Sequence, residues 1–383
     1  MTETKITETP APAQAPARED ATLVPSATPS LSATAAMAFF PTLDHSRLIL
    51  VPPANGYLYH GVYPGGKTGK EDDITPEDLA SYESAVGKKA AWVYFSNNWG
   101  TSRSFPLETV VWIDQAGSVP FIRLMLRSDM EHFKQDSLFT LQDILEGKFD
   151  QDLTSWFNTA KSWGKPLLVE FGTEMNGEWF SWNAKWNGSF STRRYGDPDE
   201  VDGVERFRDA YRHIVKLSRQ VGCNNLLWVW HVNDTDSPDK PWNRLESYYP
   251  GNEYVDLLAV SVYGEQSPLS DGKPDFVKSL DTVYARLTKL TLDKPILLAE
   301  FGSDANNPFT DQVIWAESAL NHLLADRWPN VIGFAWWNET WQNDDDPDHD
   351  TNMRVQDSPE LLRLFRERFD TEHLIEDLLI VAD

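Results

Sequence analysis

Residues 166–172 read PLLVEFG, residues 204–222 read VERFRDAYRHIVKLSRQVG, and residues 225–232 read NLLWVWHV. The first and third runs are short and apolar on both faces, which is typical of strands buried in a parallel sheet. The middle run repeats its apolar residues at helical spacing and ends in a glycine, as many helices do. A strand, a helix and a strand in this order predict a β-α-β unit with two parallel strands.

The same alternation continues along the chain from about Leu48. Six further short apolar runs lie at 57–63, 90–95, 119–126, 255–263, 295–302 and 331–337. Amphipathic segments separate them, including 76–87, 153–164, 276–290 and 311–327, and Thr75 before Pro76 is a typical helix N-cap. Eight strands that alternate with helices favour an α/β fold of the (β/α)8 TIM-barrel type over an open doubly wound sheet.

The N-terminal segment has a different composition. Residues 1–40 are rich in Thr, Pro, Ala and Ser, a mixture that buries too little apolar surface to offset the entropy lost on ordering. We therefore expect a disordered tail over 1–40 and a single domain over 41–383.

Charge and cysteine content exclude several classes of protein. With 34 Lys and Arg against 59 Asp and Glu, the net charge of −25 disfavours nucleic acid and anionic membranes as partners. Cys223 is the only cysteine, so neither an intrachain disulfide nor a cysteine-rich metal site can form. The sequence shows no transmembrane run and no signal peptide, so we expect a cytoplasmic monomer, with secretion as the alternative if an export signal is missing.

Two carboxylates follow or end apolar strand runs: Glu174 follows the fourth run, and Glu300 lies in the seventh. The carboxyl ends of barrel strands meet at the face that carries the active site of such folds. A buried carboxyl group has a raised pKa, and two that lie close together push their pKa values apart. One acid and one carboxylate are what the hydrolysis of a glycosidic bond requires.

Aromatic side chains gather directly after the first of these carboxylates. Trp179 and Trp182 lie in a polar stretch with Asn176, and the chain holds 16 tryptophans in all. Aromatic rings that stack on sugar C–H faces, with amides that bond hydroxyl groups, hold neutral sugars. We interpret these three residues as substrate-binding, with packing inside the loop as the alternative for the tryptophans.

Several longer segments resemble glycoside hydrolase family 26, the β-mannanase family. They read GKFDQDLTSWFNTAKSWGKPLLVEFGTEMNGEWFSW, FRDAYRHIVKLSRQVGCNNLLWVWHVN, YYPGNEYVDLLAVSVYG, KPILLAEFGS and NMRVQDSPE. The likeness covers about residues 56–370 and keeps its order. It implies a retaining enzyme on a (β/α)8 barrel, in which Glu174 is the acid/base and Glu300 the nucleophile.

The resemblance also implies roles for three aromatic residues and shows two departures. Tyr263 matches the tyrosine that hydrogen-bonds the nucleophile, Trp179 an aromatic of the cleft, and Trp336 the tryptophan below the reacting sugar. Glu170 and Thr173 stand where family members commonly have Arg and His. Thr173 can still donate a hydrogen bond to the sugar but carries no charge, so we expect the change to affect which sugar is accepted.

Other polar or aromatic groups at strand ends are weaker candidates for substrate contact. His231 could bind sugar hydroxyls or serve as a structural hydrogen-bonding group, and Trp99 could line the cleft or pack in a loop. Arg123 lies on the third strand run, where it could contact the substrate. Either Arg123 or Arg354 could neutralise Glu170, and the sequence does not choose between them.

Residues 343–350 read NDDDPDHD and carry the oxygen ligands that calcium takes. The segment lacks the glycine and the terminal glutamate of an EF-hand loop, so we expect a solvated charge run and no metal site. No phosphate loop, zinc motif or dinucleotide fingerprint occurs, and we expect no cofactor.

These observations predict a retaining endo-β-glycanase that hydrolyses a neutral β-linked polysaccharide, first β-1,4-mannan or glucomannan. Mixed-linkage glucan or xylan is the alternative substrate. A catalytically silent carbohydrate-binding barrel is the alternative from another class of protein, and Glu170 and Thr173 are its support.

Overall fold

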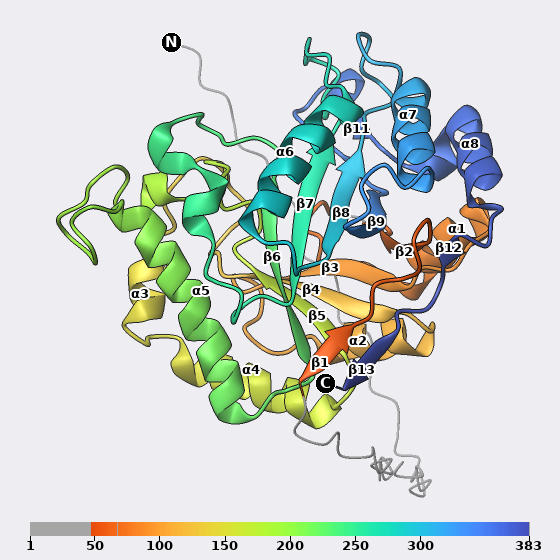
Figure 1. The fold of residues 1–383 in the computed structure, drawn as a ribbon. Helices are drawn as coiled ribbons and strands as arrows, with labels where there is room; N and C mark the ends of the chain where they lie inside the picture. The colour runs from red at the N-terminus through yellow and green to blue at the C-terminus, as the bar shows by residue number, and fades with distance from the viewer. Residues whose placement is uncertain (1–46, 67, 383) are drawn as a thin grey trace, which may run out of the picture. The chain divides into compact units, whose positions relative to one another are not determined.

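The computed structural model of the protein describes residues 47–66 and 68–382. Its centre is a closed barrel of parallel strands, in which each strand pairs with the next along the chain and the last pairs with the first (Figure 1). The strands are β2 (Leu58–Tyr63), β3 (Trp92–Asn98), β4 (Val119–Met125), β5 (Leu167–Phe171), β6 (Leu226–Asn233), β7 (Leu257–Tyr263), β8 (Ile296–Gly302) and β9 (Val331–Trp337). All eight predicted strands are present, and the predicted TIM barrel is confirmed.

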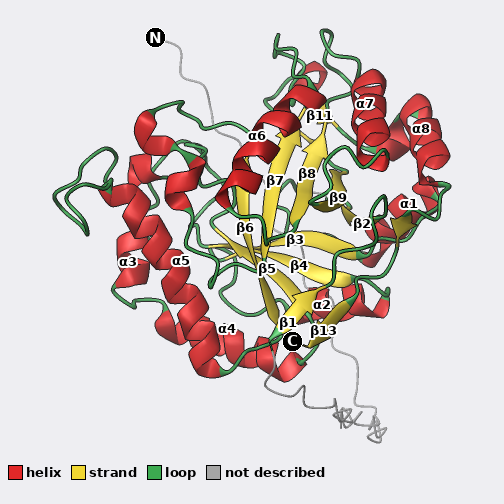
Figure 2. Cartoon of the chain, viewed as in Figure 1, coloured by secondary structure: helices red, strands yellow, loops and turns green. Residues whose placement is uncertain are grey.

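Helices surround this barrel (Figure 2). They are α1 (Pro76–Val86), α2 (Leu107–Gln115), α3 (Leu141–Leu145), α4 (Asp150–Trp163), α5 (Asp202–Val221), α6 (Phe276–Leu290), α7 (Gln312–Leu324) and α8 (Pro359–Phe369). The helix α5 connects β5 to β6 and matches the segment that predicted the β-α-β unit. Its buried residues lie on one face, which packs on the strands and hides the helix-spaced apolar residues from water.

The ends of the helices follow their local sequence. The Thr75 side chain accepts a hydrogen bond from the backbone N–H of Asp78, and the Asp78 carboxylate accepts one from the backbone N–H of Thr75 in return. This capping box satisfies N–H groups that a helix start leaves without partners. Gly87, Gly164 and Gly222 end α1, α4 and α5 in the left-handed conformation that glycine adopts without strain.

Short elements close the ends of the domain. The strands β1 (Leu48–Leu50) and β13 (Ile380–Ala382) form an antiparallel pair, and β12 (Leu374–Ile375) adds to the edge of β2. The strands β10 (Thr340–Trp341) and β11 (Thr351–Asn352) form a hairpin that carries the acidic loop. The described residues also form the 3-10 helices η1 (Ala184–Trp186), η2 (Pro241–Asn243), η3 (Leu245–Tyr248), η4 (Pro347–His349) and η5 (Val355–Asp357).

The expectation of a disordered tail over 1–40 falls outside the described residues. Within 47–66 and 68–382, no helix is long and apolar enough to cross a membrane.

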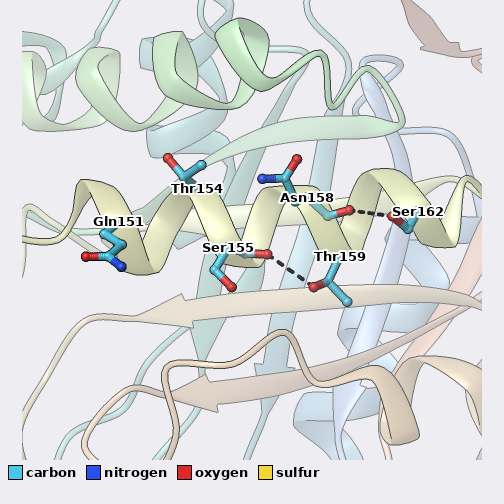
Figure 3. A pocket seen from close by; sticks show the side chains of 6 residues that line it. All are labelled: Gln151, Thr154, Ser155, Asn158, Thr159 and Ser162. Carbon is cyan, nitrogen blue, oxygen red and sulfur yellow. Dashed lines mark hydrogen bonds between the residues drawn. The ribbon is translucent and has the colours of Figure 1, made fainter.

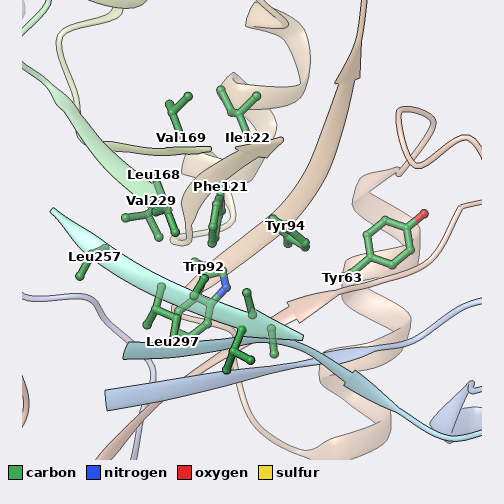
Figure 4. Close-up of a cluster of buried hydrophobic side chains, with 14 of the residues drawn as sticks. Tyr63, Trp92, Tyr94, Phe121, Ile122, Leu168, Val169, Val229, Leu257 and Leu297 are labelled. Atoms are coloured by element: carbon green, nitrogen blue, oxygen red, sulfur yellow. The ribbon is translucent and has the colours of Figure 1, made fainter. Parts of the chain in front are cut away.

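Trp92, the first residue of β3, fills the barrel interior near the amino ends of the strands. Its side chain is fully buried and lies among the apolar side chains of the neighbouring strands (Figure 4). Two glycines make room for the indole: a Cβ atom at Gly61 would lie 2.1 Å from it, and one at Gly333 would lie 2.8 Å from it. Because carbon atoms do not approach so closely, the size of Trp92 requires glycine on both β2 and β9.

We predict that Gly61→Ala lowers the free energy of unfolding by about 1–3 kcal/mol, since the added methyl group overpacks the barrel interior against Trp92. Urea denaturation measures the change. The double variant Gly61→Ala/Trp92→Phe is the control, because a smaller ring gives the methyl group space. It should lose less stability than the sum of the two single variants, and strict additivity would show that the two side chains do not compete for space.

Candidate active site

A polar layer lies directly above the apolar interior, toward the carboxyl ends of the strands. On β3, β4 and β5, the inward residue after the apolar layer is Tyr94, Arg123 and Glu170, respectively. The strands β2 to β9 each contribute one residue to this polar layer: Tyr63, Tyr94, Arg123, Glu170, His231, Ser261, Glu300 and Trp337. The barrel thus gathers two carboxyl groups, a guanidinium and an imidazole that are far apart in sequence.

Glu300 reaches this layer because β8 contains a bulge. Val260 pairs with Leu298 and Ser261 pairs with Glu300, so Ala299 is an extra residue on the β8 side. Leu297 belongs to the buried apolar cluster (Figure 4) and pairs with Ala259. Regular alternation from Leu297 would turn Glu300 to the opposite face, whereas the extra residue returns it to the face of Leu297, in register with Ser261. A single inserted residue therefore aims the carboxylate into the barrel.

Three side chains hold the Glu300 carboxyl group. The Tyr263 hydroxyl donates to Oε2 at 3.0 Å, and the Tyr94 hydroxyl oxygen lies 3.1 Å from Oε1. The Arg123 guanidinium lies 3.5 Å from Oε1. Both oxygens thus have donors, and Glu300 is 4 % exposed, so its orientation is fixed.

Glu174 follows β5 in an unusual backbone conformation. Its φ is +49°, a value that residues other than glycine seldom adopt, and its N–H donates to the carbonyl oxygen of His231 at 2.9 Å. The Trp179 indole N–H donates to Oε2 at 2.7 Å. A Cβ atom at Gly177 would lie 2.2 Å from the Trp179 ring, so glycine allows the indole to pack there. Strained backbone of this kind is concentrated at functional sites.

The environment of Glu174 makes it an acid near neutral pH. Burial raises the pKa of its carboxyl group to about 7, and the negative charge of Glu300 contributes in the same direction. The carbonyl oxygen of His231 accepts from Glu174, and Ser261, which lies 2.9 Å from His231 Nε2, pairs in register with Glu300, so both carboxyl groups lie at the same site. A protonated acid and a carboxylate that lie together can donate a proton to one atom of a bound molecule and attack another.

Glu170 lies at the centre of the polar layer and is fully buried. His231 Nδ1 lies 2.8 Å from Oε2, the Tyr94 hydroxyl donates to Oε1 at 2.5 Å, and Arg123 Nε lies 3.4 Å from Oε1. Burial alone would raise the pKa of Glu170, but His231 and Arg123 outweigh it and lower the pKa below its usual value. Burial likewise opposes the charge on His231, yet Glu170 raises the pKa of the imidazole.

These contacts answer two questions that the sequence leaves open. Arg123 neutralises Glu170, whereas the charged neighbour of Arg354 is Asp357 at 3.9 Å. His231 has protein partners on both ring nitrogens, since Nε2 lies 2.9 Å from Ser261 Oγ, and it is fully buried. It is therefore a structural hydrogen-bonding group of the polar layer.

Thr173 and Asn176 are both fully buried, and their side chains bond to protein groups. Thr173 Oγ1 lies 2.9 Å from His231 Nδ1. The Asn176 amide donates to the carbonyl oxygens of Asn233 and Thr235 and to Asp236, and it accepts from the N–H of Asn233. The Asn176 amide therefore joins the loops after β5 and β6, and its contact with substrate stays a prediction.

Three of the predicted cleft tryptophans are buried among protein groups. Trp336 is fully buried between the barrel and α8: its ring packs on Phe365, and its N–H donates to the carbonyl oxygen of Met353. Trp182 is 3 % exposed and donates to the carbonyl oxygen of Thr173. Trp99 is 2 % exposed and packs on rings of the surrounding loops, namely Phe139 and Phe149. Each of these three side chains thus packs against or bonds to protein groups, and its contact with substrate stays a prediction.

Trp337, the neighbour of Trp336, faces the site. It stacks on Tyr63 with ring centroids 4.1 Å apart, lies 6.1 Å from the Tyr94 ring, and has the Arg123 guanidinium 5.4 Å from its centroid. Of the predicted tryptophans, Trp179 lies at the carboxyl groups. The side chain that reaches inward from β9 is thus the second tryptophan of the pair.

The sequence did not predict two acidic residues of the site. Glu71 forms an ion pair with Arg123 and accepts from Ser96 Oγ at 2.6 Å. Glu339 accepts from the Tyr63 hydroxyl at 3.1 Å and from the Trp337 indole at 3.2 Å. Burial, followed by the charge of Glu71, raises the pKa of Glu339 to about 8.

The acidic loop uses its carboxylates internally. Asp344 accepts from the N–H of Asp346 at 2.8 Å and lies 2.7 Å from His349 Nδ1. Within the described part of the chain, no three His, Cys, Asp or Glu side chains are grouped so that they could hold a metal ion.

A polar surface on α4 lies outside the site. Its six side chains come from one face of that helix: Gln151, Thr154, Ser155, Asn158, Thr159 and Ser162 (Figure 3). The Thr159 and Ser162 hydroxyls donate to carbonyl oxygens of the same helix. We assign this surface no part in the chemistry.

The amino-acid sequence is similar to those of two known proteins over part of their length. Endoglucanase H of Acetivibrio thermocellus is 27 % identical over 312 residues, which are 80 % of this chain and 31 % of that protein. The mannan endo-1,4-beta-mannosidase A and B of Caldalkalibacillus mannanilyticus is 31 % identical over 168 residues, which are 44 % of this chain and 27 % of that protein. The matches thus span less than a third of the length of these two relatives.

Solved structures share the fold. A family 26 β-mannanase from Bacteroides ovatus superposes with a TM-score of 0.57 at 16 % identity, over 84 % of this chain and 90 % of that one. The catalytic domain of an endo-beta-1,4-mannanase from Bacillus sp. JAMB-750 gives the same score and identity over 84 % and 87 %. The model of glycosyl hydrolase family 26 matches residues 134–356, a segment that contains both Glu174 and Glu300. The chain belongs to glycosyl hydrolase family 26.

Proposed function

We propose that the protein is a retaining endo-β-glycanase, in which Glu174 protonates the leaving oxygen and Glu300 attacks the anomeric carbon. The observation that carries the proposal is the pair of unequal carboxyl groups. Burial keeps Glu174 protonated up to about pH 7, while the Tyr263 hydroxyl donates to Glu300 and the Arg123 guanidinium places a positive charge beside it.

The reaction takes place in two steps. Glu300 forms a covalent bond to the sugar while the proton of Glu174 passes to the departing oxygen. The ionised Glu174 then takes a proton from water, which attacks the anomeric carbon and releases Glu300. The donors to Glu300 from Tyr263 and Arg123 suit a carboxylate that returns to its charged form after each cycle.

β-1,4-Mannan or glucomannan is the first substrate of this proposal, because relatives matched over 44–47 % of the chain bear the name mannan endo-1,4-beta-mannosidase. A mixed-linkage β-glucan is the second candidate. It is favoured by the match to an endoglucanase, which extends over 80 % of the chain, and by the absence of the usual Arg and His at Glu170 and Thr173. We further propose that the protein acts as a monomer.

The two carboxyl groups should differ in their effect on substrates with different leaving groups. Glu300→Ala should lower kcat/KM on every substrate by more than ~10⁴-fold, since no covalent intermediate can form. Glu174→Ala should lower it by ~10²–10⁴-fold on polysaccharides but by less on aryl glycosides with acidic phenols, which leave without a proton. Released reducing ends from mannan, mixed-linkage glucan and xylan, together with released phenol, measure both effects.

Glu108→Ala, which removes an exposed carboxylate on α2, is the matched control and should behave as wild type. The outcome that contradicts hydrolysis is a wild-type protein that binds one of these polymers and releases no reducing ends from any of them. In that case the chain is a carbohydrate-binding barrel.

The pH dependence of kcat/KM on polysaccharide should show an alkaline limb with its midpoint at about pH 7, because Glu174 must be protonated to donate. Activity is therefore present below this pH and lost as the pH rises through it. With an aryl glycoside of an acidic phenol, the limb should be absent from kcat/KM. An identical limb on both substrates would assign it to a group other than Glu174.

Double displacement at Glu300 predicts retention of configuration. Proton NMR of a fresh digest should show the β-anomer of the new reducing end first, followed by mutarotation toward equilibrium. An initial α-anomer would mean direct attack by water and would exclude Glu300 as the nucleophile.

A further inference from the structure

Phe133 is an exposed aromatic residue held in a strained conformation. Its side chain is 60 % exposed, and its φ of +59° is rare for a bulky residue. Its N–H donates to the carbonyl oxygen of Trp179 at 3.0 Å. Strained backbone is concentrated at functional sites, and here it carries an exposed aromatic ring.

The loop around Phe133 is anchored by its own polar groups. Asp136 accepts from the N–H groups of Ser128 at 2.6 Å and of Phe139 at 2.9 Å. Lys134 donates to Asp129 at 2.8 Å and to Glu131 at 2.6 Å. The loop therefore keeps its shape without burying the phenyl ring, and it presents the ring from an anchored backbone.

Phe133 lies on the side of the site that carries Glu174. Trp179, whose carbonyl oxygen bonds Phe133, donates its indole N–H to the acid/base carboxyl group of Glu174. A hollow next to the loop is lined by Trp179 and Phe180 and by polar residues, namely Arg127, Asp129, Glu131, Lys134, Asp136 and Ser181. Because Glu174 protonates the leaving oxygen, the sugars that leave extend from the acid/base side of the site.

We propose that Phe133 is a stacking platform for a sugar of the leaving-group segment, beyond the sugar that Glu174 protonates. The inference rests on the proposed function and extends it to the substrate chain. An aromatic face surrounded by charged and polar groups suits a β-linked neutral sugar, whose apolar C–H face covers the ring while its hydroxyl groups reach the rim. A ring on an anchored backbone adds affinity with less loss of entropy on binding than a ring on a mobile loop.

The test compares substrates that reach the platform with one that does not. For Phe133→Ala, the ratio of kcat/KM on a β-linked hexasaccharide to kcat/KM on an aryl glycoside should fall about tenfold, as loss of one stacking contact implies. The fall should appear as a raised KM with kcat little changed, because the contact holds ground state and transition state equally. Phe133→Trp, which keeps an aromatic face, should restore the ratio to within about twofold of wild type.

Leu292→Ala is the matched control. Leu292 is 77 % exposed in the loop between α6 and β8, at the opposite end of the barrel from the carboxyl groups, and its removal should leave the ratio unchanged. Circular dichroism of each variant confirms that the fold is intact. An unchanged ratio in Phe133→Ala overturns the proposal, and so does an equal loss on both substrates, which would mean that Phe133 supports Trp179 and Glu174.

The stacking platform can be tested even if the proposed hydrolysis is not observed. If the wild type hydrolyses neither substrate, isothermal titration calorimetry with the hexasaccharide still tests the platform. A tenfold weaker affinity of Phe133→Ala with recovery in Phe133→Trp supports it, and equal affinity of all three proteins overturns it.

Discussion

The charge balance around Arg123 is the constraint on which the polar layer depends. Its side chain is 3 % exposed and lies against three carboxylates, those of Glu71, Glu170 and Glu300. Buried carboxylates without a cation would take up protons or destabilise the fold, because water no longer solvates their charge. Arg123 and His231 supply the compensating charges, and the Tyr94 hydroxyl connects Glu170 to Glu300. The nucleophile proposed here thus belongs to a network of which every member needs the others.

The barrel and the pair of carboxyl groups could be predicted because they follow from local patterns. Strand length, apolar faces and helix caps are properties of neighbouring residues, and the carboxyl ends of parallel strands must meet at one face of a barrel. Local patterns could not show which of Trp336 and Trp337 points into the barrel. Since β9 is buried on both faces, its sequence does not distinguish the inward residues from the outward ones. For the same reason the bulge at Ala299, which turns Glu300 inward, leaves no mark in the sequence.

The partners of the site could not be predicted, because they come from distant parts of the chain. Glu170 departs from the family pattern in sequence, but its neutralisation depends on His231, which is 61 residues away, and on Arg123 of the adjacent strand. The positive groups that a family member commonly has on the strand before the acid/base are supplied here by the two strands on either side. Glu71 escaped prediction for a related reason, because it lies in a loop whose course over the barrel only the tertiary structure reveals.

The different roles of the two carboxyl groups follow from the elements that carry them. Glu300 lies within a strand, where the register places it against Arg123 and two tyrosine hydroxyls. Glu174 lies past the end of its strand and has a left-handed backbone conformation. The uncharged indole of Trp179 donates to its carboxyl group. A neutral donor offsets less of the cost of burying a negative charge than a guanidinium does, so burial raises the pKa of Glu174. The proposed division into acid and nucleophile therefore comes from backbone geometry, which brings the cation of the barrel to one carboxyl group and a neutral hydrogen bond to the other.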